Sequence, residues 1–296
     1  MIARWVAALD FWLQFSARLA RRPAAWIVLH RLLSVPLLLR LPRRTLASSG
    51  VIVTTRVRSP LAWLLPDPGS SSGAPDLDVV QVHPWMAWWW RRRGRVIVPT
   101  FVRYRGRVEE IPPPRPSKSL RANLTKAERN GFVARPGDEW GLARRMAEDW
   151  ARGRFGEDVW MPPEHAWGRM RRHGRLLTIS DGTRDVAVAV VIAAHGGREA
   201  WFTALGLAEG DPELLRAGAI TAVYAAVADD ARAIGAATID SGRCYARGDD
   251  PIGEYKARWG YRPVRDPFSP VFAVRALSEA GSRFLADAPL IRLARI

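Results

Sequence analysis

The order of strand and helix patterns between residues 176 and 240 limits the possible folds more than any other feature. Three strand-like segments are joined by tight turns at Asp181-Gly182 and Gly196-Gly197, where glycine supplies the positive φ that short hairpins need. A long helical pattern with proline in its first turn follows, and then a short apolar strand. The predicted elements are the strands Leu176 to Ser180, Asp185 to Ala194 and Ala200 to Leu207, the helix Pro212 to Ile234 and the strand Ala236 to Asp240.

The stretch from Ala236 to Arg262 combines a buried strand with a dense set of polar residues. We expect the strand to end at Asp240, a polar loop to run from Ser241 to Asp250, and a short helix to carry Glu254 and Lys256. A polar loop held between a rigid strand and a helix is a common place for a site, because the rigid elements orient the loop residues. We therefore expect a functional site in this stretch.

The composition indicates a folded, strongly basic protein. A chain of 296 residues can bury one large core or two small ones, and a hydrophobic content of 48% argues against disorder. The formal net charge of +16 predicts attraction to phosphate groups of nucleic acid, anionic lipid or a nucleotide-type cofactor. Charge alone does not choose among these three. Of the 45 basic residues, the lysines are Lys118, Lys126 and Lys256.

Cysteine and histidine usage bears on redox environment and metal binding. Cys244 is the only cysteine, so no intramolecular disulfide can form, which suits a reducing cytoplasm. The five histidines are scattered and show no spacing typical of metal ligands, so we predict no metal. We expect the protein in the cytoplasm, with peripheral attachment to the inner face of the cell membrane as an option that the N-terminal segment raises.

Residues 1–50 form a separate basic and apolar segment. Apolar residues recur at near-helical spacing, and the apolar run that follows is interrupted by His30, Arg31 and Pro36. Residues 1–44 could lie as amphipathic helix on an anionic membrane surface, pack as helices on the main domain, or cross a membrane. We expect three parts: this segment, a main domain over residues 51–276, and a basic C-terminal helix over 277–296.

A tryptophan-rich segment precedes the main run of strands. The sequence from Val79 to Gly94 predicts a short strand and then a helical turn with Trp85, Trp88 and Trp89 on one side. These rings could form core contacts, with the following arginines at the end of the helix. Alternatively, rings and arginines together could stack on bases and bind phosphates.

Three motifs occur in an order that resembles the GNAT acyltransferase fold. They are HPWMAWWW around Trp85, SLRANLTKAERNGF from Ser119 and IDSGR…YKARWGYRP from Ile239. Within that superfamily the chain is most similar to FemAB-type aminoacyl transferases and related single-domain acetyltransferases. The resemblance implies an α+β fold, with a mixed and mostly antiparallel sheet flanked by helices and an extra N-terminal helical segment. The glycine-rich pyrophosphate loop of most GNAT enzymes is absent, and residues 215–219, LRAGA, replace it only in part.

Four residues are candidates for catalysis. The resemblance places Lys256 near a substrate phosphate or a developing oxyanion, and it places Tyr245 where related enzymes have a tyrosine acid. Asp240 could orient or deprotonate an amine, or it could cap the loop that follows it. Glu254 could act as a base, although glutamate in the first turn of a helix is ordinary.

Further residues are candidates for binding the two substrates. A helix N-terminus near Arg216 and Gly218 could hold phosphates through free backbone N–H groups, or it could be a simple helix start. Three basic residues near 121–129 could line a substrate groove or form a solvated face. We assign Leu207, Arg216, Ala217, Gly218 and Arg258 to the donor, and Arg121, Lys126, Arg129 and Arg243 to the acceptor.

The resemblance implies an N-acyltransferase that uses acyl-CoA, such as acetyl-CoA, without a metal. Its acceptor would be the amine of a sugar, peptide or lipid-linked precursor. One alternative is a FemAB-like aminoacyl transferase acting on a cell-wall precursor. Another is a non-catalytic GNAT-fold module that binds nucleic acid or an anionic membrane.

Overall fold

The chain forms two compact units, each built around its own sheet. The computed structural model describes residues 12–20, 24–29, 44–48, 51–57, 77–82, 86–99, 101–155, 161–246, 250–269 and 271–287. The first unit comprises residues 1–23, 103–242 and 254–263, and the second comprises 24–102, 243–253 and 264–296. The boundaries expected near residues 50 and 277 remain predictions.

The first unit contains most of a seven-stranded sheet with the order β11-β5-β10-β9-β8-β7-β6. Strands β6 to β9 pair antiparallel, and β9 pairs parallel with β10, so the expected α+β fold with a mixed, mostly antiparallel sheet is confirmed. The strands are β5 Phe101–Arg107, β6 Val133–Gly137, β7 Gly174–Ser180, β8 Asp185–Ala194, β9 Glu199–Leu207, β10 Thr238–Tyr245 and β11 Arg262–Arg265.

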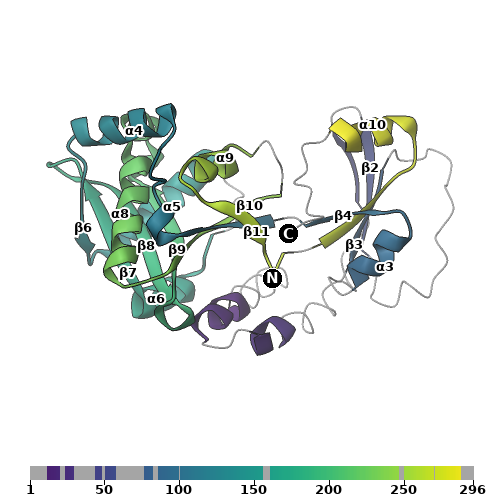
Figure 1. The fold of residues 1–296 in the computed structure, drawn as a ribbon, viewed down its shortest axis with the longest axis horizontal. Coiled ribbons are helices and arrows are strands. Elements are labelled where there is room, and N and C mark those ends of the chain that lie inside the picture. Colours follow the sequence, from purple (N-terminus) through teal and green to yellow (C-terminus); the bar gives the residue numbers. More distant parts are fainter. Residues whose placement is uncertain are drawn as a thin grey trace. The chain divides into compact units, whose positions relative to one another are not determined.

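Helices cover both faces of this sheet around β8 (Figure 1). Val188, Val190 and Ile192 pack in one core cluster with side chains of α5 (Trp140–Phe155) and α6 (Glu164–His173). Because side chains alternate along a strand, the odd-numbered residues of β8 point to the other face, where α8 contacts β7, β8 and β9. The remaining helical elements of this sheet's segments are η3 Val108–Glu110, α4 Lys118–Arg129, η4 His195–Gly197, η5 Ala208–Gly210, α7 Pro212–Ala217, α8 Ala219–Ala233 and α9 Pro251–Arg258.

Residues 12–19 form a helix that belongs to the core of the first unit. Leu13, Phe15, Ala17 and Arg18 are all buried, and Phe15 joins the cluster that α5 and α6 form with the sheet. For these residues the structure shows the packed-helix alternative. Residues 24–29 are also helical, and the rest of the segment 1–44 apart from Ala20 and Arg44 lies outside the described residues, so membrane contact there remains a prediction. Among the described helices none is long and apolar enough to cross a bilayer.

The long helix predicted from Pro212 to Ile234 is in fact two helices that meet at Gly218. Gly218 has a φ of +98°, in the left-handed region that glycine tolerates and other residues rarely adopt. A Cβ atom at this position would lie 3.2 Å from the backbone nitrogen of Ala127 on α4. The chain therefore breaks the helix at a glycine that lies against α4.

The strand expected to stop at Asp240 instead continues to Tyr245, so the loop predicted from Ser241 was wrong at its start. The reason is that the polar residues of this stretch find partners inside the fold. The hydroxyl of Ser241 donates to the carbonyl oxygen of Tyr104 on β5 at 3.1 Å, and Arg243 pairs with buried Asp266. Polar composition alone therefore did not mark a loop.

Alanine substitution should have opposite effects at Gly218 and Gly168. Gly218→Ala should lower the free energy of unfolding by more than about 1 kcal/mol, because both the left-handed backbone and the contact with Ala127 oppose a Cβ atom. Gly168→Ala should raise it by about 0.5–1 kcal/mol, because Gly168 lies inside α6 with open space around it. Urea unfolding of both variants measures the difference, and equal effects would contradict the helix break as a structural requirement.

The second unit contains a five-stranded sheet with the order β1-β2-β3-β12-β4. Only β2 and β3 pair in parallel, and the other neighbours pair antiparallel. Helix α3 packs on the face that carries Val271 and Ala273, and α10 packs on the face that carries Val274. The predicted C-terminal helix is described over α10 alone. The elements are β1 Arg44–Ser48, β2 Val51–Val57, β3 Leu77–Val82, α3 Ala87–Arg92, β4 Val96–Pro99, β12 Val271–Ala276 and α10 Glu279–Asp287.

The tryptophan face predicted for the first helix of this unit differs in the structure. Trp90 is the buried ring of α3, whereas Trp88 is 56% exposed, and Trp85 lies outside the described residues. Trp89 is partly buried and meets Trp90 edge to face, with ring centroids 4.7 Å apart. The helix is only six residues long, so its position against β3 and β12 decides which ring is buried.

Candidate active site

A fully buried carboxylate, Asp240, lies on β10 in the first unit. Arg103 binds it with two hydrogen bonds, from Nε to Oδ2 at 2.6 Å and from Nη2 to Oδ1 at 2.8 Å. Arg18 donates to Oδ2 at 3.0 Å and Arg105 at 3.2 Å, while the backbone N–H of Gly242 donates to Oδ1 at 2.9 Å. Asp240 thus joins β5, the N-terminal helix and its own strand.

A second buried carboxylate, Glu199, completes this group from the first residue of β9. Arg105 lies 2.9 Å from its Oε2 atom and Arg18 lies 3.4 Å from Oε1, while Nε2 of His195 is 3.7 Å from Oε1. We call Arg18, Arg103, Arg105, Glu199 and Asp240 the arginine–carboxylate cluster. Within the described residues, no group of three or more His, Cys, Asp or Glu side chains is placed to hold a metal ion.

The charges of the cluster fix the protonation state of Asp240. Burial disfavours its charged form, but the guanidinium groups of Arg103 and Arg18 outweigh burial and hold the pKa of Asp240 well below its usual range. Burial, together with the charge of Asp240, raises the pKa of Glu199. Burial also lowers the pKa of Arg18 to about 10. Of the roles considered for Asp240, the geometry therefore favours orienting its surroundings over accepting a proton.

Lys256 extends from α9 and has its ammonium group buried. The residue is 4% exposed, and its Nζ atom donates to the carbonyl oxygen of Ser241 at 2.6 Å. The ring centroid of Tyr104 lies 5.8 Å from the same nitrogen. A buried positive charge is costly unless it is paired, so a lysine whose ammonium group is buried against the backbone of Ser241, the residue after Asp240, is a candidate functional group.

The ammonium group lies where two parallel strands stop pairing. The register of β9 and β10 covers three residue pairs and ends with Asp240 opposite Trp201, although both strands continue. Two residues later, Gly242 has a φ of +85°, a conformation that marks a bend in a strand. A Cβ atom there would lie 3.7 Å from the carbonyl oxygen of Phe202 and 3.9 Å from Nζ of Lys256. A Cβ atom would fit at these distances, so the positive φ, and not a close approach, is what favours glycine at the point of divergence.

The structure does not place the other two predicted catalytic residues, Glu254 and Tyr245, with Asp240 and Lys256. Glu254 is exposed and pairs with Arg258 one turn along α9, with Oε2 3.6 Å from Nη2. Arg258, a residue predicted to bind the donor, is exposed as well. Tyr245 is the last residue of β10, and its side chain lies outside the described residues. The structure thus brings Asp240 and Lys256 together around residues 240–242.

The residues predicted to bind donor phosphates lie around the break between α7 and α8. Arg216 is exposed and pairs with Glu213. The carbonyl oxygen of Ala217 accepts a hydrogen bond from Nδ2 of Asn130 at 2.8 Å, so α4 and the residue after it hold this backbone. Gly218 lies against α4, as described above. Leu207, at the end of β9, is fully buried in the core.

The residues predicted to bind the acceptor fall into two groups. Arg121, Lys126 and Arg129 are exposed on the solvent-facing side of α4. Arg243 instead forms an ion pair with the buried carboxylate of Asp266 in the second unit and lies 5.5 Å from the ring of Phe101. The α4 group is available to solvent, whereas Arg243 has a structural partner.

Sequence reasoning missed the partners of Asp240. Arg103 and Arg105 stand two residues apart on β5, so they point to the same side of the strand, and such a pair inside an apolar strand is a usable signal. Arg18 comes directly after the buried positions 13, 15 and 17 of the N-terminal helix, so it did not have to face solvent. Glu199 begins an otherwise apolar strand. Each was an isolated charge in an apolar context, which burial must pair.

Comparison with known proteins gives no family assignment. No family model matches the chain, and no curated protein is significantly similar in sequence. Similar solved structures do exist. Three of them are a domain from Agrobacterium fabrum assigned to a lysylphosphatidylglycerol synthetase (12% identity, TM-score 0.42, 88% of this chain and 96% of that one), FemX (9%, 0.43, 83% and 85%) and a GCN5-related N-acetyltransferase from Kribbella flavida (16%, 0.35, 88% and 98%).

Proposed function

We propose that this chain transfers an acyl group from acyl-CoA to an amine. The observation that carries the proposal is the buried ammonium group of Lys256 at the point where β9 and β10 stop pairing. Diverging strands leave backbone donors and acceptors that an extended, amide-containing arm such as that of CoA can use. A fixed positive charge beside such a binding path is suited to a carbonyl oxygen that becomes negative during the reaction.

The proposed chemistry needs few groups from the protein. The amine nitrogen attacks the thioester carbonyl carbon, which forms the C–N bond and places negative charge on the carbonyl oxygen. Lys256 stabilises that oxyanion, and its collapse breaks the C–S bond. The proton lost by nitrogen passes to sulfur, and we assign its delivery to Tyr245 at the end of β10. Asp240 positions the site by holding the N–H of Gly242 and the arginines around it.

One observation favours a second candidate, aminoacyl transfer to a cell-wall precursor. The backbone at Ala217 and Gly218, where the resemblance places the CoA pyrophosphate, is held by Asn130 and packed against Ala127. An aminoacyl donor would not need a pyrophosphate site there. For either donor we propose an acceptor amine on a sugar, peptide or lipid-linked precursor at the inner face of the membrane.

Ligand stabilisation tests the choice of donor. CoA, acetyl-CoA and a long-chain acyl-CoA should raise the melting temperature of the full-length protein. Each should add about 2.7 kcal/mol when present at about 100 times its dissociation constant. A saturable shift that survives added salt supports acyl-CoA as donor. A shift that inorganic pyrophosphate reproduces, or that salt abolishes, contradicts it. Stabilisation by oligonucleotides or anionic vesicles alone, with steep salt dependence, would instead support a non-catalytic binding module.

A further inference from the structure

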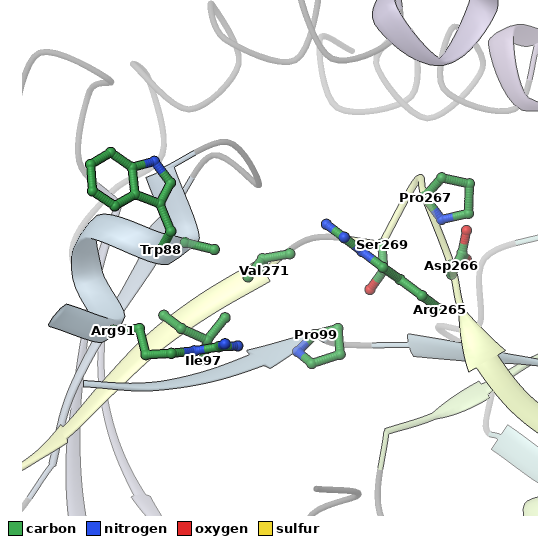
Figure 2. A pocket seen from close by; sticks show the side chains of 10 residues that line it. Trp88, Arg91, Ile97, Pro99, Arg265, Asp266, Pro267, Ser269 and Val271 are labelled. Atoms are coloured by element: carbon green, nitrogen blue, oxygen red, sulfur yellow. The ribbon is translucent and has the colours of Figure 1, made fainter. Parts of the chain in front are cut away.

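The second unit contains a cavity of about 260 Å³ beside α3 and β4 (Figure 2). Its walls are largely apolar and include Ile97, Pro99, Pro267 and Val271. Two arginines, Arg91 of α3 and Arg265 of β11, also line it. Figure 2 shows their side chains reaching into the hollow from opposite sides. The cavity therefore combines an apolar surface with two cationic groups.

Arg91 differs from the other arginines around α3. The three others each contact a tryptophan ring, and one of them also forms a buried ion pair. The side chain of Arg91 makes no hydrogen bond, ion pair or ring contact with the described residues, and the residue is exposed. The contacts of the others are Arg92 over Trp88 at 5.0 Å, Arg93 over Trp89 at 3.8 Å, and Arg95 over Trp90 at 4.9 Å with its Nη2 atom 2.9 Å from Asp78.

The acid at the cavity does not neutralise the two arginines. Asp266 is 3% exposed, and its carboxylate accepts hydrogen bonds from Nε of Arg243 and from the backbone N–H of Phe268, the latter at 3.0 Å. Its charge is therefore balanced by Arg243. Arg265 has no ion-pair partner in the described part of the chain. Within the part of the chain that the structure describes, no ion pair compensates the charges of Arg91 and Arg265 at the cavity.

We propose that this cavity binds a phosphate monoester that carries a short apolar chain. A phosphate monoester has a charge of about −1.5 to −2 at neutral pH. Two guanidinium groups match that charge better than they would match the single negative charge of a carboxylate ligand. Guanidinium groups bind phosphate oxygens with paired hydrogen bonds. The apolar walls suit the apolar chain of the ligand. The cavity volume lies below the usual range of about 300–1,000 Å³ for ligand pockets, so the part of the ligand that it encloses is small.

Calorimetric titration of the full-length protein with hexyl phosphate tests the proposal. Hexyl phosphate should bind about tenfold or more tightly than inorganic phosphate, which lacks the chain, and than hexanol, which lacks the charge. Arg91→Gln and Arg265→Gln should each weaken binding about tenfold or more. Arg93→Gln is the matched control, because Arg93 is an exposed arginine next to the same helix that does not line the cavity.

Two results would overturn the proposal. One is wild-type affinity for hexyl phosphate in both cavity variants, and the other is hexanol binding as tightly as hexyl phosphate. The comparison of the three probes on the unchanged protein stands even if a variant fails to fold. Because the same chemistry occurs in lipids, sedimentation with phosphatidic acid vesicles separates the sources. If the protein binds these vesicles and Arg91→Gln abolishes that binding, the ligand is a lipid headgroup. If the protein binds hexyl phosphate but not the vesicles, the ligand is a soluble monoester.

Discussion

Asp240→Asn should lower the free energy of unfolding by about 3–5 kcal/mol, the usual cost of removing one partner from a buried ion pair. The substitution nearly preserves volume, so the loss comes from charge. Arg18 and Arg103 are both almost fully buried and would each lose a charged partner, while Arg18 would keep its contact with Glu199. Because Arg18 belongs to the N-terminal helix, that helix should lose its attachment first, which amide hydrogen exchange over residues 12–19 can report.

Asp229→Asn is the matched control for this prediction. Asp229 lies on α8 and pairs with Arg232 at 2.6 Å, but its side chain is 76% exposed. Exposed ion pairs contribute little to stability, so this variant should unfold like the wild type in urea. If Asp240→Asn behaved like the control, the arginine–carboxylate cluster would not be the link that holds these elements together.

The same variant should change the acid dependence of stability. The pKa of Asp240 is depressed in the folded protein relative to about 3.9 in the unfolded chain, so its ionised form stabilises the fold. That contribution is present above about pH 4 and is lost as the pH falls towards the folded pKa. Glu199 has the opposite sign, because its raised pKa gives stability at low pH that is lost as the pH rises. Asp240→Asn should therefore lose stability less steeply than the wild type below about pH 4.

Local patterns predicted the central elements well, because those elements obey local rules. The strands at 176–180, 185–194 and 200–207 and the turns at Gly182 and Gly196 follow from alternation and glycine placement, and the structure confirms them. The helix break at Gly218 could not be predicted in this way. The glycine of LRAGA can end a helix, but a single glycine inside a helical pattern is often tolerated, so the sequence alone did not decide. The deciding contact is with α4, which lies about 90 residues earlier in the chain.

The candidate site was predictable only in part for the same physical reason. Asp240 and Lys256 could be placed together because both lie in one strand–loop–helix stretch. The charges that set the state of Asp240 come from Arg18 and Arg103, which are 222 and 137 residues away in sequence. Pairing of that kind is decided by tertiary packing, and the sequence shows only that a charge must be paired if it is buried.

Lys256→Met should reduce acyl transfer about 100-fold while leaving donor binding largely intact. Methionine keeps the length of the side chain and removes the charge, and loss of one group that stabilises an oxyanion costs about 100- to 1,000-fold in turnover. Lys256→Ala is less informative, because the side chain is buried and would leave a cavity. The carbonyl of Ser241 would lose a partner in either variant, so the fold should also lose about 1–3 kcal/mol.

The design separates a catalytic role of Lys256 from a structural one. Release of the CoA thiol in the presence of an amine acceptor, measured well below the melting temperature of each variant, gives turnover, and the thermal shift with the same donor gives binding. Lys118→Met is the control, because Lys118 is an exposed lysine at the start of α4 and has no proposed role. Loss of turnover with retained donor binding in Lys256→Met, but not in the control, assigns the ammonium group to the reaction. Equal turnover in all three proteins would leave Lys256 as a packing residue, because a charge that stabilises the transition state cannot be removed without slowing the chemical step.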